Sequence, residues 1–155
     1  MTEATALFTR STSGAEVIES LIGGCATSIQ AALYRFANPR IGSALRGAVA
    51  RGVAVRVCLN YNDHYEENRA AQDLLGSYCI PFRIVQGKAG SGSKMHHKFA
   101  VFDGRTVATG SYNWTLESEE RNYENLLVLG DAEMAAAYAE EFEALWTEGE
   151  RPQEP

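Results

Sequence analysis

Two patterns of apolar residues alternate along the first half of the chain: short continuous runs and helical spacing. Short apolar runs of strand length lie at residues 5–9, 28–36, 53–59 and 82–85. Between these runs, apolar residues recur at helical spacing over residues 15–23, 41–50 and 63–78. The run Ser28–Phe36 is apolar on both faces, which is typical of a strand covered by helices on both sides of a sheet. Strands and helices in alternation predict an α/β unit.

Residues that favour helix ends support these boundaries. Ser13 is placed to cap the first helix, with Glu16 at the third helical position as in a capping box. Asn38 and Pro39 suit the cap and the first residue of the second helix. Gly52 follows this helix, at a position where glycine commonly ends one.

The middle of the chain changes character. Gly87–Lys94 is rich in glycine and serine, and it predicts a flexible loop. Strands are expected at Lys98–Phe102 and Thr106–Thr109, joined by the hairpin turn sequence Asp103-Gly104. Gly110–Asn122 is then a polar connection.

The chain closes with a buried strand at residues 126–129 and an amphipathic helix at residues 132–146. With 155 residues, of which 45% are hydrophobic and 22% charged, its size and composition are typical of one globular domain. We expect this domain to cover residues 1–148, and an acidic tail over residues 149–155 to be disordered.

The cysteines indicate a reducing compartment and no metal site. Cys25, Cys58 and Cys79 are odd in number, far apart in the sequence and set among apolar residues, so we expect reduced thiols in the core. Structural zinc would need a tighter cluster of ligands. The sequence shows neither a secretory signal nor an apolar run long enough to cross a membrane. We therefore expect a cytoplasmic protein without a membrane anchor.

Charge is distributed unevenly along the chain. The net charge of −6 argues against a nucleic-acid partner. However, residues 131–155 contain eight acids and one base, whereas residues 1–130 contain 13 bases and 12 acids, for a charge of +1. Residues 83–105 contain five bases and one acid. Such a local basic patch is typical either of a solvated face or of a surface that binds a polyanion.

Side chains that could act in catalysis are concentrated in Met95–Thr115. His96 and Lys98 lie two apart on an expected strand, so they point to the same face and can reach one phosphate. An imidazole can attack phosphorus and titrates near neutrality. An ammonium group can neutralise phosphoryl oxygens where charge develops.

Four more polar residues complete the candidate site. Asp103 lies at the hairpin turn, Ser111 and Asn113 are small polar donors, and Glu124 enters the last strand. A carboxylate beside a histidine can fix its tautomer. Each residue also has an ordinary alternative: a surface histidine pair, a strand-edge lysine, a turn, a loop or an exposed strand position. Their combination favours a site.

The pattern His-x-Lys-x4-Asp over residues 96–103, with Gly110–Thr115 and Asn122–Asn125, resembles the phospholipase D superfamily. The match is closest to its single-motif branch of bacterial endonucleases and mitochondrial phospholipase D-like (Zucchini-type) proteins. Ala31–Phe36 and Arg51–Val55 fit the N-terminal half of the same family. The resemblance implies an α/β fold with a mixed β-sheet flanked by helices on both faces.

The resemblance also implies a metal-independent phosphodiesterase with no cofactor. In the family, two copies of the motif face each other, and this chain has one copy. A homodimer with one site at its interface would follow. His96 of one subunit would form a phosphohistidine, and His96 of the other would protonate the leaving oxygen and then activate water.

The neighbouring residues receive their roles from the same resemblance. Lys98 and Asn113 would bind the phosphoryl oxygens, with Ser111 assisting. Glu124 would orient the histidine, and Asp103 would support the motif structurally.

We expect a nuclease that acts on DNA or RNA, with single strands favoured. Lys88 and Lys94 suit a polyanion backbone, and Tyr112 and Trp114 are candidates either for stacking on bases or for core packing. The alternatives are a lipid phosphodiesterase that cleaves phosphatidyl headgroups or cardiolipin, and a non-catalytic nucleic-acid-binding module. The acidic C-terminal segment could shield the basic patch or bind a protein regulator.

Overall fold

The computed structural model describes residues 2–61 and 66–151. Its strands are β1 (Glu3–Phe8), β2 (Ser28–Leu33), β3 (Ala54–Asn60), β4 (Phe82–Gly87), β5 (Gly90–Lys94), β6 (Lys98–Phe102), β7 (Thr106–Gly110) and β8 (Asn125–Gly130). Its helices are α1 (Gly14–Gly24), α2 (Pro39–Ala50), α3 (Glu66–Ser77), α4 (Leu116–Glu120) and α5 (Ala132–Glu148). None of the helices in these ranges has both the length and the apolar character needed to span a bilayer.

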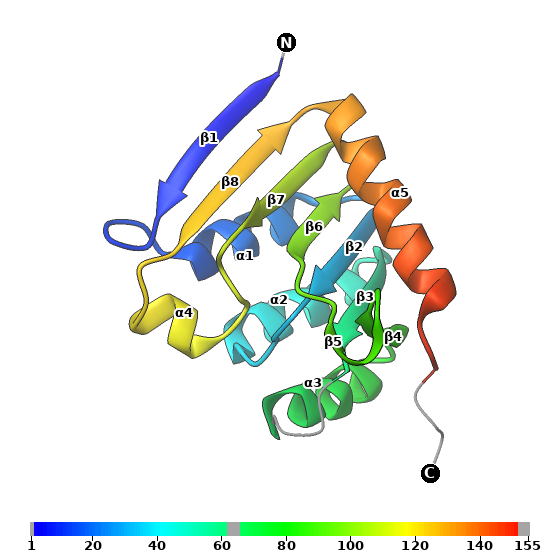
Figure 1. The fold of residues 1–155 in the computed structure, drawn as a ribbon. Helices are drawn as coiled ribbons and strands as arrows, with labels where there is room; N and C mark the ends of the chain where they lie inside the picture. Colours follow the sequence, from blue (N-terminus) through cyan, green and yellow to red (C-terminus); the bar gives the residue numbers. More distant parts are fainter. Residues whose placement is uncertain (1, 62–65, 152–155) are drawn as a thin grey trace.

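The strands of the described chain form one mixed sheet in the order β1-β8-β7-β6-β2-β3-β4-β5 (Figure 1). The pairs β2–β3 and β3–β4 are parallel, because a helix connects each strand to the next. The pairs on either side of this parallel block are antiparallel. The structure confirms the predicted mixed sheet.

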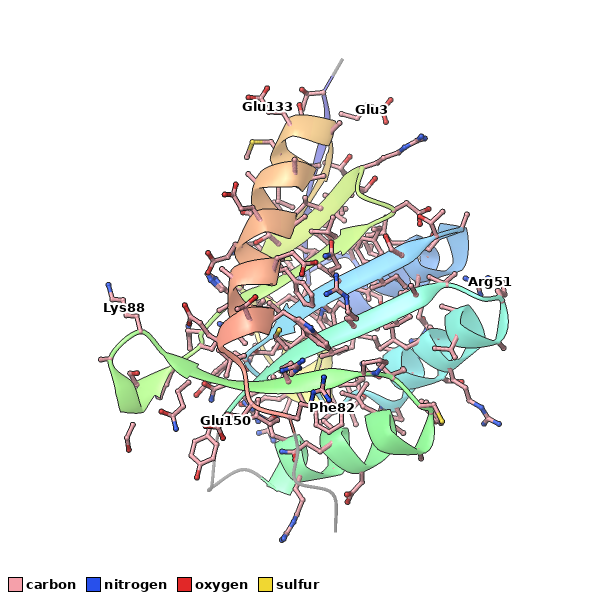
Figure 2. The ribbon with its side chains drawn as sticks, turned by 90° about the vertical axis from the view of Figure 1, so that its right-hand side faces the viewer. Glu3, Arg51, Phe82, Lys88, Glu133 and Glu150 are labelled. Carbon is pink, nitrogen blue, oxygen red and sulfur yellow. The ribbon has the colours of Figure 1, made fainter. Side chains whose placement is uncertain are left out.

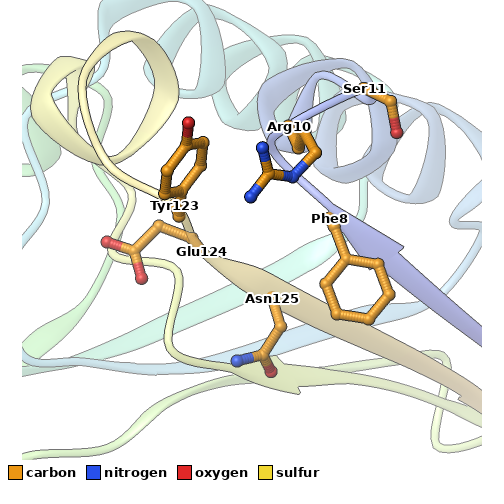
Figure 3. Close-up of a pocket in the computed structure, with 6 residues that line it drawn as sticks. All are labelled: Phe8, Arg10, Ser11, Tyr123, Glu124 and Asn125. Carbon is orange, nitrogen blue, oxygen red and sulfur yellow. The ribbon is translucent and has the colours of Figure 1, made fainter.

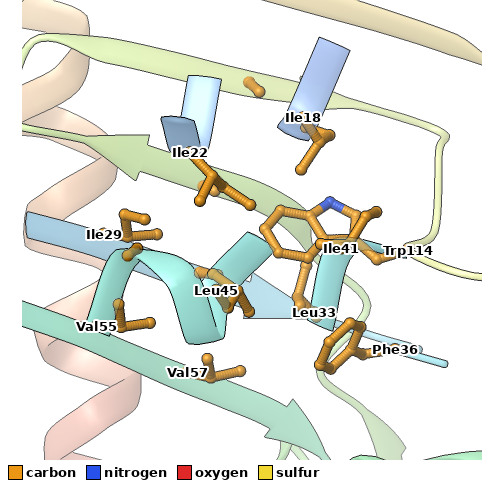
Figure 4. Close-up of a cluster of buried hydrophobic side chains, with 14 of the residues drawn as sticks. Ile18, Ile22, Ile29, Leu33, Phe36, Ile41, Leu45, Val55, Val57 and Trp114 are labelled. Carbon is orange, nitrogen blue, oxygen red and sulfur yellow. The ribbon is translucent and has the colours of Figure 1, made fainter. Parts of the chain in front are cut away.

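Helices cover both faces of the sheet, as the two-sided apolar pattern of β2 predicts. On one face, α1 and α2 pack on a cluster that includes Ile18, Ile22, Ile29, Leu33, Ile41, Leu45, Val55 and Val57 (Figure 4). On the opposite face, α5 lies across the strands and buries Phe142 and Leu145 against Val101 and Val107 (Figure 2). Ala32 of β2 belongs to this second cluster.

The predicted helix caps are present, with one addition. The Ser13 hydroxyl accepts the Glu16 N–H at 3.1 Å, and Asn38 Oδ1 accepts the Arg40 N–H at 3.0 Å. A carboxylate also reaches the start of α1, but it is Glu119 of α4, which accepts the Ala15 N–H at 3.0 Å. This contact ties the connection between β7 and β8 to the first helix.

Two segments differ from the sequence-based expectation. Gly87–Lys94 is not a loop: β5 turns back on β4, and Gly90 and Gly92 have the positive φ angles of 75° and 83° that this tight, bulged hairpin requires. In the tail expected to be disordered, Glu150 exchanges backbone hydrogen bonds of 2.9 Å with Ile84. Ile84 lies in the part of β4 that precedes its pairing with β5. Residues 152–155 lie outside the described residues.

The cysteines are free thiols in the structure. Burial raises the pKa of Cys25 to about 11 and that of Cys58 to about 12. Cys79 is exposed, which corrects its expected place in the core, because it lies in the left-handed turn that ends α3 (φ 56°).

The Asp103 carboxylate fastens the β6–β7 hairpin to the start of β2. It accepts the backbone N–H groups of Ala26 at 2.9 Å, Thr27 at 2.7 Å and Ser28 at 3.0 Å, and the Thr27 hydroxyl at 2.9 Å. The Asp103 N–H donates in return to the Ser28 carbonyl at 2.8 Å. Burial alone would raise the pKa of Asp103, but these hydrogen bonds outweigh it and hold the pKa well below its usual range.

Replacing this carboxylate should therefore weaken the fold. We expect Asp103→Ala to lower the free energy of unfolding by about 2–3 kcal/mol near neutral pH, because three backbone donors lose a charged acceptor. The folded-state pKa is depressed, so this contribution is present above the unfolded pKa of about 3.9 and is lost as the pH falls through the folded value. Urea unfolding measures this: the difference in free energy of unfolding between the wild type and Asp103→Ala should be smaller well below pH 4 than near neutral pH. Asp73→Ala, on the exposed surface of α3, is the charge-matched control; an equal loss there would contradict this role.

Candidate functional site

The sheet order gathers the predicted polar residues at one edge. Because β6, β7 and β8 alternate in direction, the start of β6, the end of β7 and the start of β8 lie side by side (Figure 1). These strand ends carry Lys98, Ser111 and Glu124, with His96 just before β6. Asp103 lies at the opposite edge, in the turn that follows β6. The structure thus separates Asp103 from the other motif residues, in agreement with a structural role.

His96 and Lys98 meet, as their spacing predicts, although His96 itself precedes the strand. Lys98 Nζ lies 3.1 Å from His96 Nδ1 and donates to the His96 carbonyl at 2.8 Å. The ring of Tyr34 forms the floor below both: its centroid is 4.3 Å from that of His96 and 5.1 Å from Lys98 Nζ. Tyr34 was not among the predicted site residues: it lies within the expected strand Ser28–Phe36, whereas the observed strand β2 ends at Leu33 and leaves Tyr34 just beyond it.

The surroundings of the His96 imidazole favour its neutral form. Burial lowers the pKa of His96, and the positive charges of Lys98 and Lys94 lower it further, with His97 as a smaller contributor. Burial also lowers the pKa of Lys98, while the charge of Glu124 acts in the opposite direction. A neutral imidazole beside an ammonium group is suited to attack an anionic, electrophilic centre.

Glu124 is held by the loop that follows β7. It accepts hydrogen bonds from the Ser111 hydroxyl, from Ser118 Oγ at 3.2 Å and from Asn122 Nδ2 at 3.2 Å. Ser111 Oγ in turn accepts the Asn125 N–H at 3.0 Å. The contacts of Glu124 in the described chain therefore position the Ser111 loop, and its predicted contact with a histidine stays a prediction.

Asn113 lies in the same loop. Its backbone N–H donates to Ser118 Oγ at 3.3 Å. Its side-chain Oδ1 is buried and has no hydrogen-bond partner among the described residues. Since buried polar atoms are normally paired, this oxygen is an acceptor that the described chain leaves unpaired.

Tyr112 and Trp114 belong to the core, which corrects their predicted role in stacking on bases. They are 1% and 2% exposed. The Tyr112 hydroxyl donates to Glu119 at 2.7 Å, and Trp114 packs edge-on against Phe36 at 6.0 Å between centroids. Both alternate inward on either side of Asn113, so no ligand can reach their faces.

Lys88 and Lys94 line a cavity of about 450 Å³ beside His96, between the β4–β5 hairpin and α5. Glu141 and Glu148 of α5 form its opposite wall. Glu141 lies 3.1 Å from the ring nitrogen of His97, so this second histidine is directed to α5. The acidic helix is therefore placed next to the basic patch, as a shielding role would require.

Comparisons with known proteins agree with this geometry. Residues 18–146 match the family model described as "Cardiolipin synthase, PLD-like domain". Mitochondrial cardiolipin hydrolase of Xenopus tropicalis is 38% identical over 121 residues, which are 78% of this chain and 55% of the relative. Its Homo sapiens counterpart is 37% identical over 119 residues, 77% of this chain and 45% of the relative. The chain thus spans about half the length of these curated relatives.

Two solved structures share the fold over nearly the whole chain. Nuc from Salmonella typhimurium, a phospholipase D family member, superposes with a TM-score of 0.90 and 26% identity, covering 99% of this chain and 100% of that one. NucT from Helicobacter pylori gives a TM-score of 0.86 at 22% identity, covering 98% and 100%. The second likeness concerns the fold alone.

The burial of His96 and its neighbouring lysines should be visible in the titration of its imidazole. We expect its imidazole to titrate with a midpoint below the ordinary value of about 6.5. Lys94→Gln should move the midpoint upward, because it removes a nearby positive charge. The imidazole proton resonances of His96, followed by NMR across the pH range, provide the measurement. Arg105→Gln, in the turn at the opposite edge, is the charge-matched control and should leave the midpoint in place. A midpoint above the ordinary value would contradict this electrostatic account.

Proposed function

The chain belongs to the phospholipase D superfamily, and from this premise we propose that it is a phosphodiesterase that hydrolyses nucleic acid. The observation that carries the proposal is the contact between Lys98 Nζ and His96 Nδ1, 3.1 Å apart at this edge of the sheet. The loop Ser111–Asn113 follows β7, the strand next to β6. This arrangement combines a neutral nucleophile with a cation and polar groups for one phosphate.

The reaction would proceed in two displacements. An imidazole nitrogen of His96 attacks phosphorus, the bond to the leaving oxygen breaks, and a phosphohistidine forms. The leaving oxygen takes a proton from a general acid. The same group then removes a proton from water as the water oxygen attacks phosphorus, the bond from phosphorus to His96 breaks, and the phosphomonoester leaves. Lys98 stabilises the charge on the phosphoryl oxygens, with Asn113 and Ser111 beside it. No cofactor enters this scheme.

The general acid would come from a second copy of the chain. One protomer supplies a single copy of the motif, whereas the reaction needs both a nucleophile and an acid. In a twofold dimer, His96 of each protomer can approach the same phosphate from opposite sides. Glu124, already near Lys98, would then be available to orient a histidine.

Nucleic acid is favoured as the substrate because the positive charges extend along the edge. Lys94 and Lys88 lie on one side of His96, and Arg10 lies beyond Glu124 on the other. A strand with phosphates at regular intervals would contact several of these cations, whereas one headgroup phosphate would use only those at the centre.

Cardiolipin is the second candidate substrate. It is favoured by the names of the curated relatives, which are cardiolipin hydrolases. Cardiolipin is also a phosphodiester, so the same two displacements would cleave it. A non-catalytic binding module would not require the His96–Lys98 pair to be intact. A cytoplasmic location and a protein regulator stay predictions from the sequence.

The central experiment is cleavage in the presence of EDTA. We expect the full chain to cleave labelled single-stranded DNA or RNA in excess EDTA, and His96→Ala to reduce the rate at least about a thousandfold, because it removes the nucleophile. His97→Ala, which removes the neighbouring histidine, is the matched control and should keep most of the activity. Cardiolipin vesicles form a parallel arm. Cleavage of the lipid and of no nucleic acid would favour the second candidate.

The shared site has its own test. We expect light scattering to give the mass of two chains. Wild-type protein refolded with an excess of His96→Ala should lose more activity than dilution explains, because a mixed dimer would have only one of the two histidines. Activity that simply follows the amount of wild-type protein would show that each protomer works alone. Arg105→Gln in the same excess controls for mixing itself.

A further inference from the structure

Two exposed aromatic side chains and an arginine lie together where β1 ends and β8 begins. Phe8 is 57% exposed and Tyr123 is 78% exposed, in contrast to the buried Tyr112 and Trp114. The Arg10 guanidinium lies 4.2 Å from the centroid of the Tyr123 ring. With Ser11, Glu124 and Asn125, these residues line an open cavity of about 370 Å³ (Figure 3). We call the three residues Phe8, Arg10 and Tyr123 the aromatic platform.

The backbone below the aromatic platform is fixed. The Thr9 N–H donates to the Glu124 carbonyl at 3.0 Å, and the Glu124 N–H donates to Thr9 Oγ1 at 2.8 Å. Thr9 Oγ1 also donates to the Asn122 carbonyl at 2.8 Å. These bonds continue the β1–β8 ladder past its last pair, Phe8 with Asn125. The rings are therefore exposed on a rigid support, and little backbone ordering is needed when a ligand binds.

The aromatic platform is continuous with the candidate site. Glu124 lines the cavity and also accepts a hydrogen bond from Ser111. Tyr123 precedes β8, and β8, β7 and β6 are consecutive neighbours in the sheet. Two strand spacings correspond to roughly 10 Å, so Tyr123 lies about that far along the edge from the start of β6. A strand whose phosphate is at His96 would pass the platform with its neighbouring nucleotides.

We propose that the aromatic platform is a subsite for an unstacked base of the substrate strand, next to the scissile phosphate. This inference rests on the proposed nuclease function and names where the strand's flanking base binds. An exposed aromatic ring offers a face on which any base can stack. Arg10 adds a cation for the adjoining phosphate, and its planar group stacks on rings as well. Such a subsite requires bases that are free to leave a duplex, and it therefore selects single strands.

The test measures binding in the full chain made inactive by His96→Ala. Fluorescence anisotropy gives the Kd for a short single-stranded oligonucleotide. Adding Tyr123→Ala should weaken binding by roughly 5- to 100-fold, the range for loss of one stacked base. Tyr123→Phe, which keeps the ring, should restore the affinity to near that of the parent. On an oligonucleotide of abasic sites, Tyr123→Ala should have almost no effect. Met134→Ala, an exposed apolar residue at the start of α5, is the control.

The remaining outcomes separate this inference from the function on which it rests. If the His96→Ala parent binds the oligonucleotide and Tyr123→Ala binds it equally well, the subsite is overturned and the nuclease function is not. If the wild type does not cleave nucleic acid and the His96→Ala parent does not bind it, the proposed nuclease function is overturned, and the subsite with it. If Tyr123→Ala halves the mass measured by light scattering, or abolishes binding to cardiolipin vesicles but not to the oligonucleotide, the platform contacts a second copy or a lipid surface instead, and the subsite is overturned.

Discussion

The Asp103 carboxylate and the three backbone N–H groups that it binds determine where the rest of the site lies. They fix the turn between β6 and β7 against the first residue of β2. From that end the β2–β6 ladder runs from Ile29 with Phe102 to Leu33 with Lys98. The site therefore lies one strand length away, about 17 Å for five residues. A shift of one residue in this register would turn Lys98 to the other face of the sheet, away from the ring of Tyr34.

The second constraint is electrostatic. In the reaction proposed above, the attacking histidine must be neutral, and positive charge nearby attracts the phosphate. Partial burial on Tyr34 and the nearby Lys94 and Lys98 satisfy both needs, because the same cations that attract the anion also disfavour protonation of the imidazole. Glu124 balances part of this charge near Lys98 and is itself held by the Ser111 loop. The acidic helix α5 closes the other side, where Glu141 pairs with His97.

Much of this could be read from local patterns. Helix caps at Ser13 and Asn38, the Asp103-Gly104 turn and the two-sided apolar strand β2 all depend on residues near one another in the chain, and the structure has each of them. The prediction of a flexible loop over Gly87–Lys94 was wrong, because its glycines allow a bulged hairpin in which β5 pairs with β4. For Tyr112 and Trp114 the sequence left base stacking and core packing open, and only packing decided between them, because both side chains lie in the core under α1 and α2.

Spacing along the chain is enough to indicate the candidate chemical groups and the fold class: a histidine and a lysine two residues apart, the polar loop that follows, and the alternation of strands and helices. Only the tertiary structure decided which residues share a surface. It places Asp103 at the opposite edge and Tyr34 below His96, and it exposes Phe8 at the end of β1 beside Tyr123, which precedes β8, although 115 positions separate the two in the sequence. Pairing between β1 and β8 is a long-range contact, so no local pattern could report it, and burial depends on what packs above each side chain.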